Sequence, residues 1–209
     1  DFVARSADFV KYGEELVSWL FEHAPSDRGG ADDLADLKLA DGSTLAERQQ
    51  GLALKIGENI GVGEFARFRP AKGYAGAYVH HNGKVAGIVE IAGEGIADAD
   101  EVHGLVNELG MQLTFHKDVK GLTREDLDDA WVAKEREIMV AQAAEMPADK
   151  RDKIAEGKLA KRLKEVVLLE QPFIKNDKES VLQHVQGVGK AIGKPIEVSR
   201  FARIAAGNA

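Results

Sequence analysis

The hydrophobic positions near the N-terminus have the spacing of an amphipathic helix. Apolar side chains recur every three or four residues over 9–21, which is the pattern of one buried helical face. Ser6 can cap this helix, and Pro25 is expected to end it. The following stretch, 26–43, is polar and contains several glycines, so we expect a surface connection with at most a short helical piece.

A second helix is predicted to begin after Thr44. Thr44 and Glu47 have the spacing of a capping box, in which each side chain satisfies an open backbone amide of the other residue. Leu45, Leu52 and Ile56 provide its apolar positions. Gly57 is a suitable residue for its end, because glycine adopts the left-handed conformation common after helices.

The hydrophobic period then changes from that of helices to that of strands. Residues 62–69 and 74–80 are predicted strands, separated by Pro70 and Gly73. Asn82-Gly83 follows, a pair suited to the two positive φ angles of a type I′ turn. The apolar run 85–91 then returns as the second strand of an antiparallel hairpin.

The next segments mix helices and strands without regular alternation. Asp98 or Asp100 is expected to cap a helix that continues through the apolar positions of 102–113. A further helix is predicted over about 179–191, and a last strand over 196–204. This order predicts an α+β fold with antiparallel sheets rather than a doubly wound parallel sheet.

Residues 122–170 differ from the rest because they show helical periodicity only, with one break at Met146-Pro147-Ala148. We predict two amphipathic helices that turn at Pro147 and lie antiparallel, with Trp131 on the inner face. The stretch 125–145 holds seven acidic residues and two basic ones, whereas 149–170 holds seven basic and five acidic residues. Opposite charge favours side-by-side arms. The first helix is expected to carry one sparse stripe and the second helix another: Leu127, Trp131, Ile138 and Gln142, and Ile154, Leu159, Leu163 and Val166.

Composition restricts the classes of function that remain. The 209 residues are 44% hydrophobic and 30% charged, values of an ordinary globular chain with one or two compact units. The net charge of −7 argues against unaided binding to nucleic acid or an anionic membrane. No apolar run approaches the roughly 18 residues of a membrane span. The absence of cysteine excludes disulfides, thiolate metal sites and cysteine nucleophiles, and fits a reducing compartment.

A glycine-rich segment, 187–194, is the first candidate for chemistry. A phosphate-binding P-loop would need glycine at Val188 and serine or threonine at Pro195. The dinucleotide fingerprint fails as well, because Ile192 occupies its third glycine position. We therefore interpret the segment as the end of a helix and a turn.

The histidines and charged clusters give no catalytic arrangement. His80 and His81 are adjacent at the start of a turn, and adjacent strand residues point to opposite faces, so a shared metal is not expected. The acidic run 125–129 fits a solvated helix start. A basic face, formed by Lys158, Lys161, Arg162 and Lys164, is interpreted as solvated surface. The residues therefore favour a protein-binding protein without cofactor or metal.

Several segments together carry a resemblance to a known family. They are Asp1-Phe2-Val3-Ala4-Arg5 with Asp8-Phe9, Lys55 to Ile60 (KIGENI), Tyr78-Val79-His80 with the strand from Gly87 to Ile91, Glu156 to Ile174 with its Q-P-F, and Ile196 to Gly207. In order and content these segments resemble the elongation factor Ts family, the nucleotide-exchange factors of elongation factor Tu.

The resemblance implies a layout of two α+β core subdomains with an inserted helical hairpin. It places the N-terminal core subdomain at 1–70, without its first strands, and the C-terminal core subdomain at 71–121 and 172–209. The hairpin, 122–171, is the insertion. The family's N-terminal helical module would precede Asp1. The family often carries two arginines where this chain has Gly63-Glu64, so an ionic contact there is not expected.

The resemblance also implies the partner and the residues that contact it. It implies exchange without covalent chemistry, with elongation factor Tu as partner and no cofactor, nucleic acid or membrane, in the bacterial cytoplasm or an organelle matrix. The implied partner-binding residues are Asp1, Phe2, Ile56, Gly57, His80 and Ile174. Phe2 is the implied wedge beside the partner's phosphate and Mg²⁺ site. The alternative is an interaction adaptor that docks through the hairpin and leaves nucleotide release unchanged.

Overall fold

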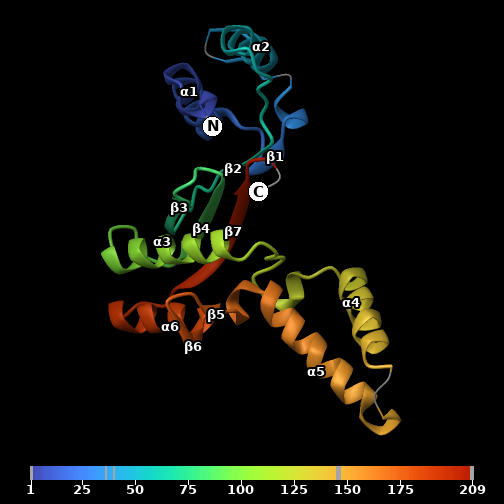
Figure 1. Cartoon of the computed structure of the whole chain (residues 1–209). Helices are drawn as coiled ribbons and strands as arrows, with labels where there is room; N and C mark the ends of the chain where they lie inside the picture. The colour runs from blue at the N-terminus through green and yellow to red at the C-terminus, as the bar shows by residue number, and fades with distance from the viewer. Residues whose placement is uncertain (1, 36, 40, 145–146, 208–209) are drawn as a thin grey trace. The chain divides into compact units, whose positions relative to one another are not determined.

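The computed structural model divides the chain into two compact units. It describes residues 2–35, 37–39, 41–144 and 147–207. Unit 1 comprises residues 1–69 and 204–209, and unit 2 comprises residues 70–203. Figure 1 shows helices and short antiparallel sheets in an irregular order along the chain. The predicted α+β class is confirmed.

Unit 1 is built mainly from two helices and a short pair of strands. Its elements are η1 (Val3–Arg5), α1 (Ala7–His23), β1 (Arg28–Gly30), η2 (Asp32–Leu34), α2 (Leu45–Ile56) and β2 (Glu64–Ala66). Its small core consists of Leu20, Ala24, Leu34, Leu45 and Phe65. The predicted helix signals are confirmed. The Ser6 side chain accepts from the Phe9 amide, Thr44 and Glu47 form the capping box, and Gly57 has a φ of 84°.

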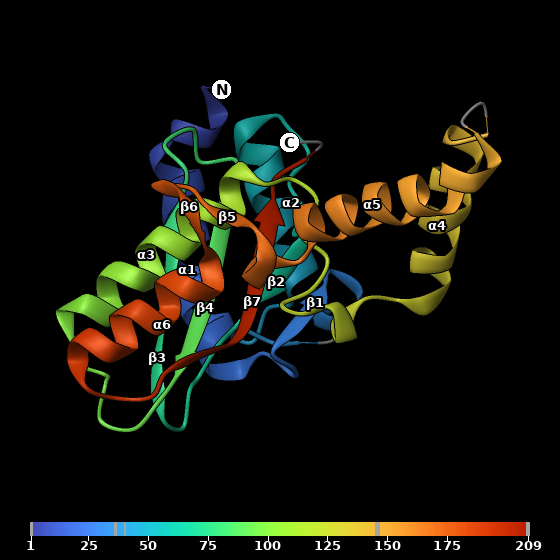
Figure 2. The ribbon, with the colours of Figure 1, turned by 90° about the horizontal axis from the view of Figure 1, so that it is seen from below.

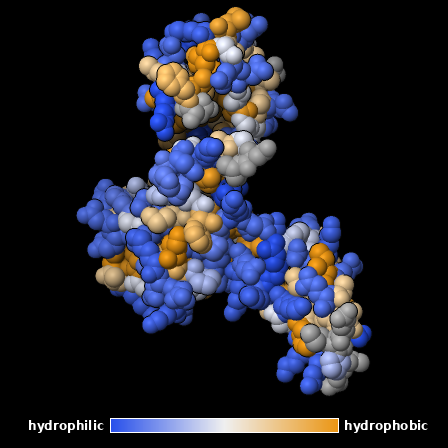
Figure 3. All heavy atoms as spheres, in the orientation of Figure 1, coloured by the Kyte–Doolittle hydropathy of each residue, from blue (hydrophilic) through white to orange (hydrophobic). Residues whose placement is uncertain are grey.

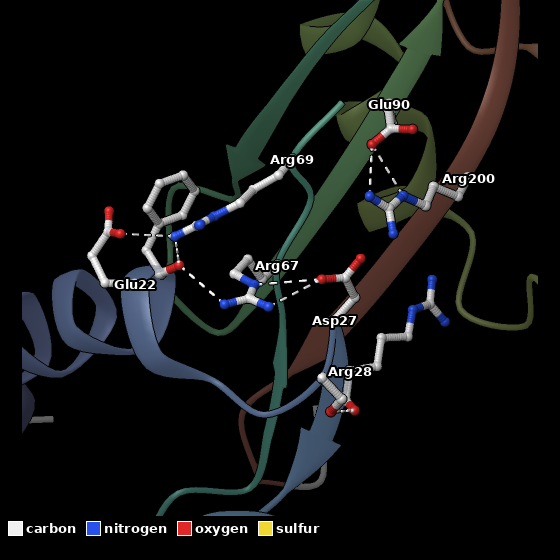
Figure 4. Close-up of polar contacts among 9 residues, drawn as sticks. Glu22, Asp27, Arg28, Arg67, Arg69, Glu90 and Arg200 are labelled. Carbon is white, nitrogen blue, oxygen red and sulfur yellow. Dashed lines mark hydrogen bonds and ion pairs between the residues drawn. The ribbon is translucent and has the colours of Figure 1, made fainter. Parts of the chain in front are cut away.

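The strand content of unit 1 differs from the prediction. Only Glu64–Ala66 of the expected strand 62–69 belongs to a strand, which pairs antiparallel with Arg28–Gly30 in the stretch expected to be a connection. The pairing is supported by side chains drawn in Figure 4: Arg67 donates to Asp27, and Arg69 contacts Glu22. The polar and glycine residues of β1 lack the alternation that predicts a strand.

Unit 2 contains the larger sheet, the helical hairpin and two further helices. Its elements are β3 (Gly73–Val79), β4 (Val85–Ala92), α3 (Asp100–Phe115), η3 (Arg124–Asp126), α4 (Asp129–Gln142), α5 (Ala148–Val166), η4 (Leu168–Glu170), β5 (Pro172–Phe173), β6 (Asn176–Ser180), α6 (Val181–Ile192) and β7 (Glu197–Ala205), whose last two residues fall in unit 1. The sheet has the order β3-β4-β7. Strands β5 and β6 form a separate antiparallel pair that the sequence did not predict.

The core of unit 2 lies between its sheet and α3, and α6 packs against α3 (Figures 1 and 2). Close helix–sheet contact depends on two glycines that face each other. A Cβ at Gly110 of α3 would lie 2.6 Å from the Tyr78 Cβ, and one at Gly87 of β4 would lie 2.7 Å from the Gly110 carbonyl oxygen. On the sheet, Arg200 of β7 donates to Glu90 of β4 (Figure 4).

Two local predictions for this unit are wrong. The β3–β4 hairpin is confirmed, but its turn is not type I′: no residue other than glycine has positive φ among the described residues. A β-turn over His80–Gly83 leaves only Gly83 with positive φ, and Asn82 Oδ1 instead accepts from the Lys84 amide. The α3 N-cap is Ala99, without a side-chain hydrogen bond, so neither Asp98 nor Asp100 caps this helix.

Helices α4 and α5 form the predicted hairpin, with Pro147 as the N-cap of α5. Met146 of the predicted break lies outside the described residues. The hairpin core consists of Leu127, Leu159, Leu163, Val166 and Val167, with Trp131, Val132 and Met139 packed against it. Trp131 is therefore on the inner face as predicted, whereas Ile138 is 39% exposed and Met139 takes the expected place of Ile138.

Candidate partner-binding surface

Phe2 is the most exposed of the large apolar side chains among the described residues, at 93%. It stands at the N-cap of η1, where its carbonyl accepts from the Arg5 amide at 3.3 Å, and Ser6 then caps α1. The η1 turn and the Ser6 cap hold the backbone that follows Phe2, while the Phe2 ring lies in solvent. Asp1, the other predicted residue of this segment, lies outside the described residues.

The second predicted segment of unit 1 is the end of α2. Ile56 is half-buried, and Gly57 is exposed with a left-handed backbone, its amide donating to the Ala53 carbonyl at 2.7 Å. Lys55 Nζ lies 2.6 Å from Asp8 Oδ1 at the start of α1. This ion pair places the end of α2 beside the start of α1, the helix that follows Phe2.

Other apolar side chains of unit 1 are also exposed, beyond the predicted residues. Leu54 of α2 is 82% exposed, and Val10, Val17 and Phe21 of α1 are also exposed. Apolar surface, orange in Figure 3, is visible on each unit and on the hairpin. Sequence reasoning missed Leu54, because its helical position counts as part of a core pattern until burial is known.

His80 directly follows β3 in unit 2, and the turn holds its backbone. Its amide donates to the Val85 carbonyl, and its carbonyl accepts from the Gly83 amide. The His80 and His81 ring centroids lie 4.1 Å apart, which contradicts the expectation of opposite faces, because His81 already belongs to the turn. His80 Nδ1 is buried without a hydrogen-bond partner in the described structure.

Ile174 follows β5 and is half-buried, and its backbone is held from inside unit 2. The Ile174 amide donates to Gln112 Oε1 at 2.7 Å. The preceding Phe173 is buried, and its ring stacks on His184 with centroids 3.8 Å apart and an interplanar angle of 13°. The predicted contact residue is thus the end of a segment anchored by two side chains that the sequence did not single out.

Charged groups surround His184 on both ring edges. Its Nε2 lies 2.9 Å from Glu108 Oε2, and its Nδ1 lies 3.3 Å from Glu179 Oε1. Lys175 also contacts Glu108, at 3.0 Å. Burial acts to raise the pKa of Glu108, but the hydrogen bonds and charges of Lys175 and His184 outweigh it, and the pKa is lowered.

The base of the hairpin carries a second charged cluster, around Trp131. Lys120 Nζ and Arg162 Cζ lie 5.1 and 5.7 Å from the Trp131 ring centroid. Arg162 also pairs with Asp118 and Glu135 at 2.5 and 3.4 Å. The sequence analysis placed Arg162 in a solvated basic face, but these contacts show that it belongs to the cluster around Trp131. Only the three lysines of the predicted face remain.

The described part of the chain shows no cluster of three metal-ligating side chains. Among its helices, none is both long enough and apolar enough to cross a membrane. The glycine-rich segment 187–194 is the end of α6 and the following turn, as interpreted, with Gly193 at a φ of 67°. The surface thus offers exposed apolar side chains on rigid elements, which suits contact with another protein.

Comparison with known proteins gives one consistent result. A family model described as elongation factor Ts matches residues 1–208. Among similar proteins, elongation factor Ts of Desulfovibrio desulfuricans is 34% identical over 98% of this chain and 70% of its own length. Elongation factor Ts of Nitratidesulfovibrio vulgaris is 34% identical over 99% of this chain and 68% of its own length, and that of a Caulobacter species is 35% identical over 99% and 66%.

Proposed function

The chain belongs to the elongation factor Ts family of translation elongation factors, and from this membership we propose that it binds elongation factor Tu and accelerates GDP release. The exchange involves no covalent chemistry and no cofactor of this chain. The proposed location is the bacterial cytoplasm.

The observation that carries this proposal is the state of Phe2. In the free protein the Phe2 ring is 93% exposed, so it does not contribute the favourable free energy of burying apolar surface. A partner that buries the ring recovers this free energy, and aromatic anchors in desolvated pockets are frequent binding hot spots. Phe2 follows Asp1 in the segment that resembles the family's wedge.

Binding linkage explains how an inserted ring releases nucleotide. If this chain binds nucleotide-free elongation factor Tu more tightly than the GDP complex, GDP affinity must fall by the same factor when the chain is bound. A ring that distorts the partner's phosphate and Mg²⁺ site produces this difference without a titrating group. We assign this role to Phe2, with Asp1, Ile56 and Gly57 contacting the same partner domain.

The remaining predicted residues are proposed to supply affinity. His80 and Ile174 belong to unit 2 and stand at the ends of β3 and β5. Each has its backbone fixed by hydrogen bonds, which lowers the conformational entropy lost on binding. We propose that these two side chains contact other domains of elongation factor Tu.

The direct test is release of labelled GDP. Elongation factor Tu preloaded with fluorescent GDP is mixed with excess unlabelled GDP, and the release rate is measured against the concentration of this chain. We expect the rate to rise with concentration and to saturate. If the chain binds elongation factor Tu but the release rate stays at its basal value, the chain is an adaptor and the exchange proposal is wrong.

A further inference from the structure

We propose that Gln112 is a positioning residue for the docking segment, defined as Gln171–Ile174, and that it fixes the backbone from which Ile174 meets the partner. This inference rests on the proposed function for the role of Ile174. Gln112 lies on α3, outside every segment that carries the family resemblance. Its side chain has no exposed surface, so it can act on a partner only through other residues.

Both the nitrogen and the oxygen of the Gln112 side-chain amide form hydrogen bonds with the docking segment. Its Nε2 donates to Gln171 Oε1 and to the Pro172 carbonyl, each at 3.0 Å, and its Oε1 accepts from the Ile174 amide at 2.7 Å. Gln171 is also fully buried, and its Nε2 donates to the Glu165 carbonyl at 2.7 Å. Both protons of the Gln112 amide and one lone pair of its oxygen are therefore engaged.

The strand pairing of this region explains the need for a buried amide. β5 has only two residues, and its register with β6 shifts between Pro172 and Phe173. The Pro172 carbonyl and the Ile174 amide instead meet Gln112, which presents a donor and an acceptor as a neighbouring strand would. Buried backbone groups without partners are strongly disfavoured, so Gln112 completes the short sheet from α3.

The surroundings of Gln112 indicate a specific role rather than a packing role. The neighbouring positions Leu109 and Leu113 on α3 and Leu168 on η4 are buried and apolar. A leucine or methionine at position 112 would suit this core without an amide to desolvate. A fully satisfied polar network in such a core fixes one arrangement of the groups that it joins. Here that arrangement is the backbone of Ile174.

The test separates positioning from stability by comparing Gln112→Met with Leu109→Met. Both variants place an unbranched apolar side chain in the same helix and core. Gln112→Met is expected to lower the melting temperature more than Leu109→Met, because it leaves the Pro172 carbonyl and the Ile174 amide without their hydrogen-bond partner. Only Gln112→Met should raise, by about tenfold, the chain concentration that gives half-maximal GDP release, because the segment must then be ordered on binding. The maximal release rate should stay unchanged, since it depends on Phe2.

The double variant Gln112→Met/Ile174→Ala shows whether Gln112 acts through Ile174. We expect its half-maximal concentration to equal that of Ile174→Ala alone, because groups in one network are not additive. Additive effects, or an unchanged half-maximal concentration in Gln112→Met, would overturn the inference.

A measurement on the unchanged chain makes the test independent of variant folding and of elongation factor Tu. We expect the Ile174 amide to be protected from hydrogen exchange to a similar degree as amides in α3. Rapid exchange of this amide would overturn the positioning role. A protected amide in a chain that does not accelerate GDP release would instead refute the proposed function and leave the Gln112 contact in place.

Discussion

At the scale of single residues, the two side chains on which our proposals rest lie in environments that their chemistry disfavours. Phe2 is an aromatic residue in solvent, and Gln112 is a primary amide in an apolar core. Either arrangement lowers stability unless something compensates for it. For Gln112 the compensation is the network to Pro172 and Ile174. For Phe2 the proposed compensation is the partner.

Replacing Phe2 with alanine should slow GDP release and leave the stability of the chain nearly unchanged. We expect Phe2→Ala to slow catalysed GDP release about tenfold or more, since loss of a hot-spot contact of about 2 kcal/mol exceeds the 1.4 kcal/mol that corresponds to tenfold. The melting temperature should stay within a degree or so, because the ring is not in a core. Stopped-flow GDP release and thermal unfolding measure the two effects.

The matched control for Phe2 is Val17→Ala, another strongly exposed apolar residue of unit 1. This variant should leave both the release rate and the melting temperature nearly unchanged. If Phe2→Ala exchanges GDP at the parent rate and melts much lower, Phe2 is a core residue and its role as the wedge is wrong.

The Glu108 carboxylate should make part of the stability dependent on pH. Its pKa is lowered from the ordinary value of 4.5, because its contacts with Lys175 and His184 outweigh burial. Its contribution is therefore present above pH 4.5 and is lost as the pH falls through the lowered pKa. We expect Glu108→Gln to lower the free energy of unfolding by about 1–2 kcal/mol at pH 7. The difference from the parent should shrink below pH 4.5.

Denaturant unfolding at several pH values measures this difference. Glu137→Gln on α4 is the control, because Glu137 is an exposed glutamate outside the His184 cluster. A deficit in Glu108→Gln that stays constant down to pH 3 would show that the charge of Glu108 contributes nothing to the native state.

The sequence motifs predicted the proposed contact residues but not the residues that support them. Phe2 and Ile174 were predicted through ordered motifs, whereas Gln112 occupies a position that helical spacing marks as core. The proposed role of Gln112 depends on β5, an irregular strand about 60 residues further along the chain. No local sequence pattern around Gln112 predicts this contact. The error about His80 and His81 has a similar origin, since strand alternation stops where a turn begins.

At the scale of elements, the boundaries that depend on local hydrogen bonds were predictable. Thr44 and Glu47 cap α2 as expected, because both partners lie within four residues. The N-cap of α3 is Ala99, since packing of the apolar positions on the sheet defines this helix without a cap. The polar strand β6, Asn176–Ser180, has no hydrophobic alternation and was missed.

The helical hairpin is the element whose independence can be tested directly. We propose that residues 122–171 are an insertion between the parts of the C-terminal core subdomain, 71–121 and 172–209. The two ends of the hairpin meet: Gly121 bridges Val167, and the Leu168 amide donates to the Gly121 carbonyl at 2.9 Å. A chain in which a short glycine–serine linker replaces residues 123–165 should therefore still fold.

We expect this shortened chain to unfold in a single cooperative transition at a somewhat lower temperature, because Val166 and Val167 lose the hairpin core above them. Near-ultraviolet circular dichroism and calorimetry report the transition. The matched control joins the same linker between residues 142 and 148, which leaves both arms in place. Loss of the cooperative transition in the shortened chain alone would contradict the insertion model.

At the scale of the whole molecule, the two units differ in the size of their cores. Unit 2 buries a cluster that joins α3, α6 and the sheet, including fully buried Leu105, Leu109 and Val89. The cluster of unit 1 is smaller, and Leu34 is its one side chain with no exposed surface. Stability follows buried apolar area, so unit 2 is expected to be the more stable unit.

Native-state hydrogen exchange should resolve this difference. Amides of α3 and β4 are expected to exchange most slowly, and those of α1 and α2 faster, because a unit with fewer buried side chains opens at a lower free energy. Leu34→Ala should destabilise unit 1 by about 2–4 kcal/mol and accelerate exchange in α1 and α2 only. Leu105→Ala, the matched variant of unit 2, should accelerate exchange in α3 and β4. If each variant accelerates both sets of amides equally, the chain opens as one cooperative body, and the small core of unit 1 is supported by unit 2.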